Sequence, residues 1–265
     1  MAKARKKNRY EAIIERIFFR HYKKGARRFP FARKEIESTA AKLRIALPKN
    51  IGDLLYSFRY RTALPTSILA TAAPGYAWNI ESTGKSSYIF QLEKISRILP
   101  RPELITIKIP DATPELVASH AQGDEQALLA KVRYNRLVDV FFGLTTYSLQ
   151  NHLRTTVKGI GQIEIDELYV GLDRHGNQYV IPVQAKGGKD QLSPVQTKQD
   201  LACCKEKFPS LTCRALSAQF MADDLIAMFE LTIQDGAVRV VDEKHYKLVP
   251  AKDITPEDLA SYRQL

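Results

Sequence analysis

The chain has 265 residues, of which 45% are hydrophobic and 26% charged, a composition typical of a folded globular protein with room for two domains. No apolar run reaches the roughly 18 residues of a membrane-spanning helix, and no signal-peptide core follows the basic N-terminus. We therefore expect a cytoplasmic protein. Three cysteines, Cys203, Cys204 and Cys213, are too few for a disulfide framework and lack the Cys-x-x-Cys spacing of a zinc site.

The net charge of +11 is concentrated at the front of the chain. Residues 1–60 hold 17 Lys and Arg against 5 Asp and Glu, whereas the remaining 205 residues hold 23 against 24. Such a basic segment is typical of proteins that bind a polyanion, because each neutralised phosphate releases counterions. Nucleic acid is the expected partner. An acidic membrane surface is the alternative, and it is disfavoured because no long exposed apolar face accompanies the basic run.

Short amphipathic helices are predicted in the first 70 residues. Tyr10, Ile13 and Ile17 recur at helical spacing and form one apolar stripe. The segment Lys24-Gly25-Ala26-Arg27-Arg28 indicates a basic loop. The predicted helices cover about 8–22, about 33–43, a segment that begins at Asn50 and a short segment that begins at Pro65.

A β-hairpin is predicted after these helices. Residues 76–80 and 87–92 have the composition of strands, and the polar segment between them contains a glycine. Helices followed by a hairpin are the layout of a winged helix-turn-helix, in which one helix enters the major groove and the hairpin touches the backbone. We therefore expect a winged-helix-like DNA-binding domain over residues 1–95. Its candidate phosphate contacts are Arg59, Arg61 and Lys85.

The rest of the chain is predicted to form a second domain over residues 113–265, joined by a Pro-rich linker over residues 96–112. One helix over 124–142 is expected to turn Leu129, Val132, Leu137, Val140 and Phe141 inward. The further predictions, which together indicate a mixed α/β sandwich, are strands over 147–157, 163–172, 179–185 and 211–218, a helix over 194–207, a hairpin over 228–241 and a C-terminal helix capped at Thr255.

Register decides which side chains of the hairpin 163–185 share a face. A three-residue turn ending at Gly176, with that glycine in the left-handed conformation, pairs Asp173 with Asn177. Gln184 then falls opposite Asp166. Side chains alternate along a strand, so both point to the same side of the sheet.

The same register places Lys186 opposite Glu164, on the face that carries Asp166. The other face then carries the apolar residues expected of a core. A turn of two or four residues would shift the register by one and place Glu167 opposite Gln184, so Glu167 is the reserve acid. Cutting a phosphodiester with a metal needs oxygen ligands for Mg²⁺ and a cation near the developing charge, and these side chains are of those types.

A carboxylate on one strand, a short hairpin and then Gln184-Ala185-Lys186 before a helix together resemble the PD-(D/E)xK nuclease superfamily, over about residues 124–220. The resemblance implies a restriction-endonuclease-like fold, Mg²⁺ with Mn²⁺ as a substitute, Asp166 as a metal ligand and Lys186 as the residue that orients the attacking water. Gln184 stands where most members have a carboxylate. A second acid is then needed, and Glu164 is the candidate. Gln196 resembles a glutamine that some members carry.

The function expected from these features is that of a type II-like restriction endonuclease, a Mg²⁺-dependent hydrolase of double-stranded DNA. Two-fold DNA suggests a homodimer with one active site per strand. Two alternatives remain open. One is a winged-helix DNA-binding regulator without nuclease activity, and the other is a structure-selective nuclease of repair or junction substrates.

Overall fold

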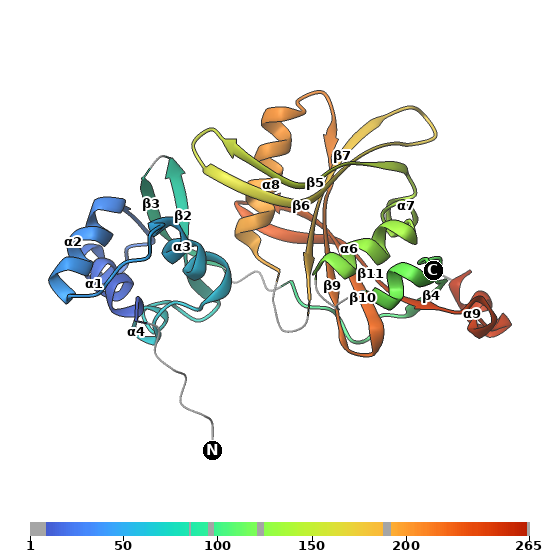
Figure 1. The fold of residues 1–265 in the computed structure, drawn as a ribbon, viewed down its shortest axis with the longest axis horizontal. Coiled ribbons are helices and arrows are strands. Elements are labelled where there is room, and N and C mark those ends of the chain that lie inside the picture. Colours follow the sequence, from blue (N-terminus) through green and yellow to red (C-terminus); the bar gives the residue numbers. More distant parts are fainter. Residues whose placement is uncertain (1–8, 85, 95–97, 121–124, 188–191, 264–265) are drawn as a thin grey trace, which may run out of the picture. The chain divides into compact units, whose positions relative to one another are not determined.

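The computed structural model describes residues 9–84, 86–94, 98–120, 125–187 and 192–263 (Figure 1). The chain divides into two compact units. The first comprises residues 1–95 and 156–162, and the second comprises residues 96–155 and 163–265. Each unit has its own sheet, so the protein is a mixed α+β structure with a small and a large sheet. In the described part of the chain, no helix combines the length and hydropathy needed to span a bilayer.

The first unit is built on a three-stranded antiparallel sheet of order β1-β3-β2. The helices predicted near its start are confirmed, and the side chain of Asn50 caps the third of them by accepting a hydrogen bond from Gly52 N. The elements are α1 (Glu11–His21), β1 (Arg28–Ala32), α2 (Arg33–Leu43), α3 (Ile51–Tyr56), the π-helical turn η1 (Ser57–Arg61), α4 (Thr66–Leu69), β2 (Tyr76–Gly84) and β3 (Ser87–Lys94).

Strand β1 differs from the sequence prediction, which placed a basic loop up to Arg28. Phe29 and Phe31 alternate with exposed residues and are buried, so this five-residue segment pairs with β3 as an edge strand. Pro30 is compatible with this position, because an edge strand bonds to one neighbour only and tolerates a residue without an N–H. Phe18 of α1 lies at the centre of the core, with its ring centroid about 5 Å from those of Phe29, Trp78 and Phe90.

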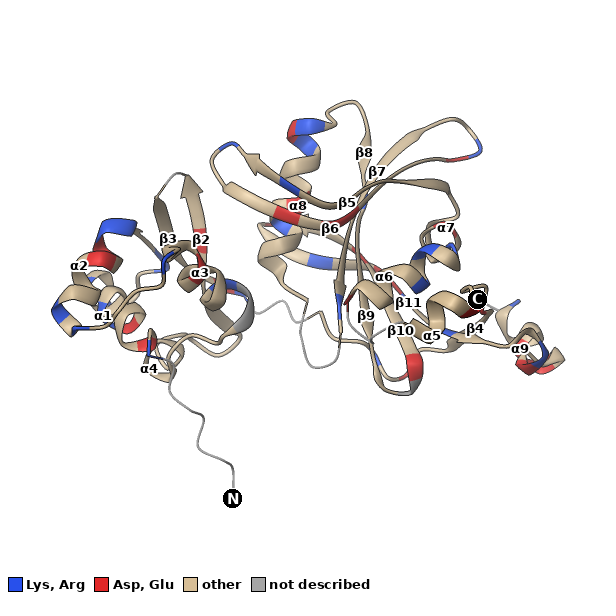
Figure 2. Cartoon of the chain, viewed as in Figure 1, with Lys and Arg blue, Asp and Glu red and all other residues tan. Residues whose placement is uncertain are grey.

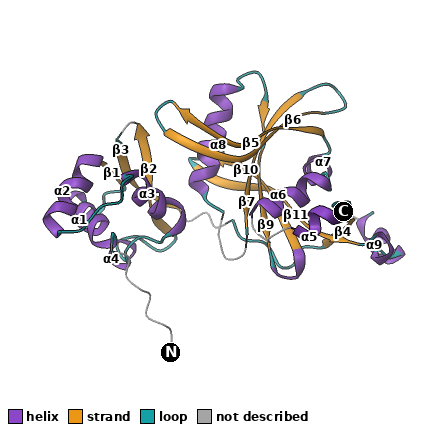
Figure 3. Ribbon diagram, viewed as in Figure 1, coloured by secondary structure: helices purple, strands orange, loops and turns teal. Residues whose placement is uncertain are grey.

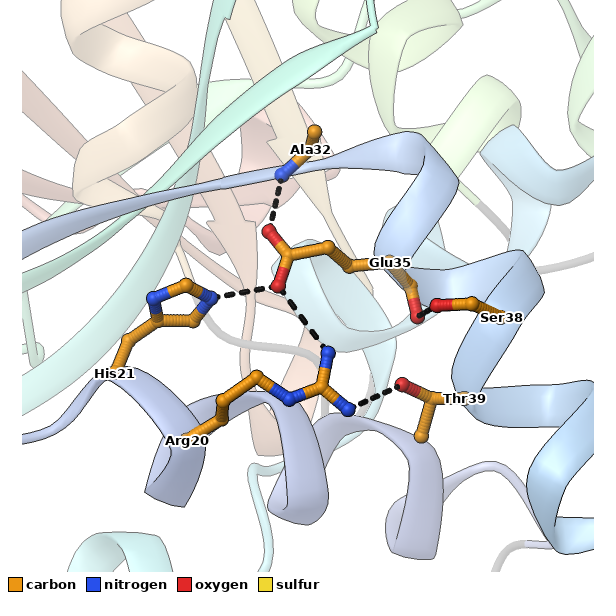
Figure 4. A network of polar contacts seen from close by, with 6 residues as sticks. All are labelled: Arg20, His21, Ala32, Glu35, Ser38 and Thr39. Carbon is orange, nitrogen blue, oxygen red and sulfur yellow. Dashed lines mark hydrogen bonds and ion pairs between the residues drawn. The ribbon is translucent and has the colours of Figure 1, made fainter.

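A polar network ties α1 to α2 and to the end of β1 (Figure 4). Glu35 accepts a hydrogen bond from Ala32 N at 3.0 Å, and its other oxygen lies 2.6 Å from His21 Nε2 and 3.4 Å from an Arg20 guanidinium nitrogen. Partial burial raises the pKa of Glu35, but the Ala32 N–H and the His21 and Arg20 side chains lower it by more, so the net shift is downward. The network therefore fixes the angle between the two helices.

The second unit is built on an eight-stranded mixed sheet of order β4-β11-β10-β9-β7-β6-β5, with β8 beside β7. The pairs β4–β11, β7–β8 and β7–β9 are parallel, and the pairs β6–β7, β9–β10 and β10–β11 are antiparallel. The strands are β4 (Thr106–Pro110), β5 (Thr145–Val157), β6 (Gly161–Leu172), β7 (Gln178–Lys186), β8 (Thr212–Cys213), β9 (Ala215–Phe220), β10 (Leu225–Gln234) and β11 (Ala237–Val249).

Two segments of this unit differ from the sequence predictions. Residues 106–110 of the expected linker form strand β4 of the large sheet, where Lys108 N donates a hydrogen bond to Tyr262 Oη. The single helix expected over 124–142, whose residue 124 lies outside the described residues, is instead two helices, because Arg136 adopts a left-handed φ of 51°. The break changes the helical phase, and Val140, expected inside, is 48% exposed.

Helices cover both faces of the central strands (Figure 3). Residues of α6 and α7 pack against Tyr169, Ile181, Val183 and Ala185, the apolar face expected from the alternation. On the other face, Leu168 and Val180 pack against Cys204 of α8. The helices of this unit are α5 (Glu115–His120), α6 (Glu125–Tyr134), α7 (Leu137–Phe142), α8 (Pro194–Lys207) and α9 (Pro256–Tyr262), the last capped by Thr255 as predicted.

Candidate active site

The β6–β7 hairpin has the register that the sequence predicts. Gly176 has a φ of 82°, and Asp173 N donates to Asn177 O at 3.1 Å, so the turn contains three residues. The pairing then continues regularly to Glu167 opposite Val183. Asp166 and Gln184, one residue further on each strand, consequently point to the side of the sheet that α8 covers.

Asp166 is partly buried near the end of the pairing with β7. Its Oδ2 accepts a hydrogen bond from the main-chain N–H of Ala185 at 2.9 Å. Burial raises the pKa of the Asp166 carboxyl, and the Ala185 N–H and the Lys186 ammonium only partly offset this effect. Glu125 and Glu164 raise the pKa further. A cation placed beside Asp166 would therefore relieve an electrostatic penalty that the protein leaves uncompensated.

Gln184 lies beside Asp166 and is 3% exposed. Its Nε2 donates to both carboxylate oxygens of Asp200, at 3.2 and 3.0 Å, and to the main-chain oxygen of Glu164 at 3.2 Å. Its Oε1 accepts from Gln196 Nε2 at 3.5 Å, so the glutamine at the start of α8 does face this group. The amide is therefore held between a strand and a helix.

Asp200 is a member of this group that the sequence analysis missed. It lies in the middle of α8 and is 2% exposed, and burial holds its pKa well above the ordinary value. A signal for it did exist, because Asp200 follows Gln196 by four residues and therefore shares its helix face. The helix itself was predicted with the correct ends, Pro194–Lys207.

Lys186 is the last residue of β7, and its Nζ lies 3.0 Å from Glu125 Oε1 at the start of α6. The sequence analysis did not anticipate Glu125, since the two residues are 61 positions apart. Lys186 nevertheless lies close enough to Asp166 and Asp200 to lower the pKa of both. The ammonium is thus paired with Glu125 and acts on the Asp166 and Asp200 carboxyls at longer range.

The two other predicted acids lie elsewhere. The Glu164 carboxylate points to β5, where Oε1 lies 3.3 Å from an Arg154 guanidinium nitrogen and 3.6 Å from His152 Nδ1. Glu167, the reserve acid, points to the opposite face of the sheet and binds Arg133 of α6. It lies there because the register is the one that places Asp166, and not Glu167, on the side of Gln184.

The donor set fits a hard cation only in part. Among the residues that the structure describes, no group of three or more His, Cys, Asp and Glu side chains is placed to hold a metal ion. Asp166, Asp200 and Gln184 nevertheless offer oxygen donors. Mg²⁺ is commonly bound by one or two carboxylates, its remaining positions being filled by water and substrate phosphate. The residues present fit that kind of site, in which the nucleic acid completes the coordination.

Of the three predicted phosphate contacts in the first unit, the structure describes the side chain of Arg59 alone. Arg59 is partly buried in η1, the side chain of Arg61 is not described, and Lys85 lies outside the described residues. Lys and Arg are spread over α1 and α2 (Figure 2). On α1, Arg16, Arg20 and the 45% exposed ring of Phe19 line an open groove of about 630 Å³. Glu15 also lines the groove and Arg20 pairs with Glu35, so Arg16 and the Phe19 ring are its groups best suited to a phosphate and a base.

Comparison with known proteins gives no relative: no protein-family model, no curated protein and no solved structure matches this chain.

Proposed function

We propose that this protein is a metal-dependent DNA endonuclease, of the type II-like restriction class, that hydrolyses phosphodiester bonds in double-stranded DNA. The observation that carries the proposal is the group at the end of the β6–β7 hairpin. There a partly buried carboxylate, Asp166, shares a face of the sheet with Gln184, and the ammonium of Lys186 is near enough to lower its pKa, in the register expected of a Gln-x-Lys variant of the PD-(D/E)xK motif. A mixed sheet with helices on both faces is consistent with the restriction-endonuclease-like domain proposed for residues 113–265.

A winged-helix-like DNA-binding domain is proposed for residues 1–95. Its support is the element order α1-β1-α2-α3-η1-α4-β2-β3 together with the sheet order β1-β3-β2, a short helical array closed by a hairpin. The helix α3 and η1, which carry Arg59 and Arg61, would then lie against the major groove. The concentration of basic residues in the first 60 positions supports the same proposal.

In the proposed reaction, Asp166 and the Gln184 amide would bind Mg²⁺, or Mn²⁺ as a substitute, beside the scissile phosphate. The ion would supply positive charge to the developing phosphorane-like transition state and lower the pKa of a nearby water. Lys186 would orient that water and stabilise the charge that develops on the phosphate. We further propose a cytoplasmic homodimer, with one active site for each DNA strand.

The direct test is incubation of supercoiled plasmid with the purified protein in Mg²⁺, Mn²⁺ or EDTA. The wild-type protein is expected to cut only with a metal present, and Asp166→Asn and Lys186→Met are expected to lose at least about 100-fold in rate. Asp235→Asn, an acid-to-amide change in the exposed β10–β11 turn, is the matched control and should cut normally.

Two outcomes would replace the proposal. Binding to duplex DNA without cleavage in either metal would favour the alternative of a winged-helix regulator that lacks nuclease activity. Cleavage of branched DNA in preference to linear sites would favour the structure-selective repair or junction nuclease.

A further inference from the structure

The contacts of the Gln184 amide determine which way round it sits. The main-chain oxygen of Glu164, 3.2 Å away, can only accept a hydrogen bond, so the atom facing it is Nε2. The same Nε2 faces both oxygens of Asp200. The amide oxygen, Oε1, is therefore turned away from Asp200, toward the end of α8 where Gln196 donates to it at 3.5 Å. At that distance the contact leaves Oε1 weakly held.

Asp200 is an unusual residue to bury for structural reasons alone. A carboxylate removed from water is costly unless a cation or several donors compensate it. In the described part of the chain, Asp200 takes its hydrogen bonds from the neutral amide of Gln184, and Lys186 acts on it at longer range. Gln184, which donates to both oxygens of Asp200, occupies the position that an acid usually holds in the motif that the hairpin resembles.

We propose that Asp200 is the positioning residue of the cation site: it holds Gln184 with Oε1 available as a neutral oxygen donor and, when a cation is bound, supplies from α8 the negative charge that position 184 lacks. The inference rests on the proposed function. The Gln184 amide on β7 would supply the oxygen ligand, and the Asp200 carboxylate on α8 would supply the negative charge, that a single carboxylate at position 184 would supply together. The charge near the cation is thereby kept, although it has moved from the strand to the helix.

This arrangement differs measurably from a merely structural hydrogen bond. If the pair only joined α8 to β7, Asp200→Asn, which still offers an oxygen acceptor to Gln184, would leave cation binding unchanged. If the pair serves the cation, Asp200→Asn keeps an acceptor for Gln184 Nε2 but removes the charge. Metal-free stability should then equal or exceed that of the wild type, because a neutral amide replaces a carboxyl whose pKa burial raises, and cation affinity should fall. Placing a carboxylate at position 184 in the Asp200→Asn background should restore the cation affinity.

The test measures Mn²⁺ binding by calorimetry and metal-free urea unfolding for the full-length wild type, Asp200→Asn and the double variant Gln184→Glu with Asp200→Asn. Asp235→Asn is again the surface control. We expect Mn²⁺ affinity to fall about tenfold in Asp200→Asn and to return to within about threefold of the wild type in the double variant. The single variant Gln184→Glu, which brings two carboxylates into contact, should unfold at lower urea concentration than either.

The inference is overturned if Asp200→Asn binds Mn²⁺ as the wild type does, if the double variant stays as weak as Asp200→Asn, or if the wild type binds no Mn²⁺. None of these readouts needs cleavage. A wild-type protein that binds Mn²⁺ with the expected pattern of variants but never cuts DNA would contradict the nuclease proposal and leave the role of Asp200 standing.

Discussion

Asp166 and Glu167 are consecutive acids on one strand, and the protein treats them in opposite ways. Glu167 is fully buried under α6, where Arg133 Nε donates to it at 2.9 Å and Tyr169 Oη at 2.7 Å. Burial and the neighbouring Glu167 carboxylate both raise the pKa of the Tyr169 hydroxyl, so it remains a donor. Asp166, on the other face, has a main-chain N–H and a more distant ammonium. The charge of Glu167 is therefore compensated by Arg133, whereas Asp166 has no comparably close cation among the described residues and could bind one.

The same contrast recurs between two further acids of the second unit. Glu243 of β11 is bound by the N–H and the guanidinium of Arg101, at 2.7 and 2.8 Å, and lies 2.9 Å from His245 Nε2. Asp200 has only an amide as its hydrogen-bond partner among the described residues. The uncompensated acids, Asp166 and Asp200, lie in one group, which is why we propose that group, and not the ion pairs, as the active site.

The largest effect is expected from Arg133→Leu, which would leave Glu167 buried without its cation. We expect a loss of about 3 kcal/mol in the free energy of unfolding, at the low end of values for a broken buried pair because Arg133 is 38% exposed. Urea unfolding measures it. Adding Glu167→Gln should recover at least half of the loss, and a single variant as stable as the wild type would contradict the contrast.

Asp166→Asn should change stability in the opposite direction or not at all. The asparagine can still accept the hydrogen bond from Ala185 N, and it removes a carboxylate whose pKa burial has raised. We expect a gain of up to about 1 kcal/mol in the free energy of unfolding without metal, together with the loss of cleavage proposed above. A destabilisation as large as that of Arg133→Leu would show that Asp166 is a structural acid as well.

A pH-dependent effect is expected at Glu243. Burial raises the pKa of its carboxyl, but the Arg101 N–H, the Arg101 guanidinium and His245 lower it by more, so the folded-state pKa is below the ordinary 4.5. Its contribution to stability is therefore present above pH 4.5 and is lost as the pH falls through the lower folded-state value. Glu243→Gln should be less stable than the wild type by about 1 kcal/mol at pH 7. Unfolding measured from pH 7 to pH 3 should show this difference shrinking, and a constant difference would be the contrary result.

The smallest effect is expected at the exposed pair of Glu164. Arg154 is mostly exposed, so Arg154→Ala should lower the free energy of unfolding by less than about 0.5 kcal/mol, and added salt should abolish the difference. Urea unfolding at low and high ionic strength measures both quantities. A loss above about 1 kcal/mol would mean that Glu164 depends on its cation as Glu167 does.

Local chemistry made part of this structure predictable. The Arg174-His175-Gly176 turn fixes the register of the hairpin within a few residues, and with it the side on which Asp166 and Gln184 lie. The start of α8 follows from Pro194 in its first turn. The alternation of apolar residues likewise predicted which face of the hairpin carries the larger apolar core.

The rest depends on contacts between distant positions. Glu125 with Lys186, Asp200 with Gln184 and Arg133 with Glu167 are brought together by helix packing, on which sequence spacing carries no information. Strand β1 was missed because five residues with a central proline become a strand only through the partner strand β3. The left-handed Arg136 likewise has no local sign such as a glycine.

The anchor of Asp166 is a backbone amide, and this has a consequence for how the site can vary. Any residue at position 185 except proline keeps the main-chain N–H that donates to Asp166. The residues tolerated at position 185 are therefore limited by the space in the core and not by the hydrogen bond to the carboxylate. The acid therefore moves with the strand. The core packing around the Ala185 side chain could therefore be redesigned while the Asp166 carboxylate keeps its position.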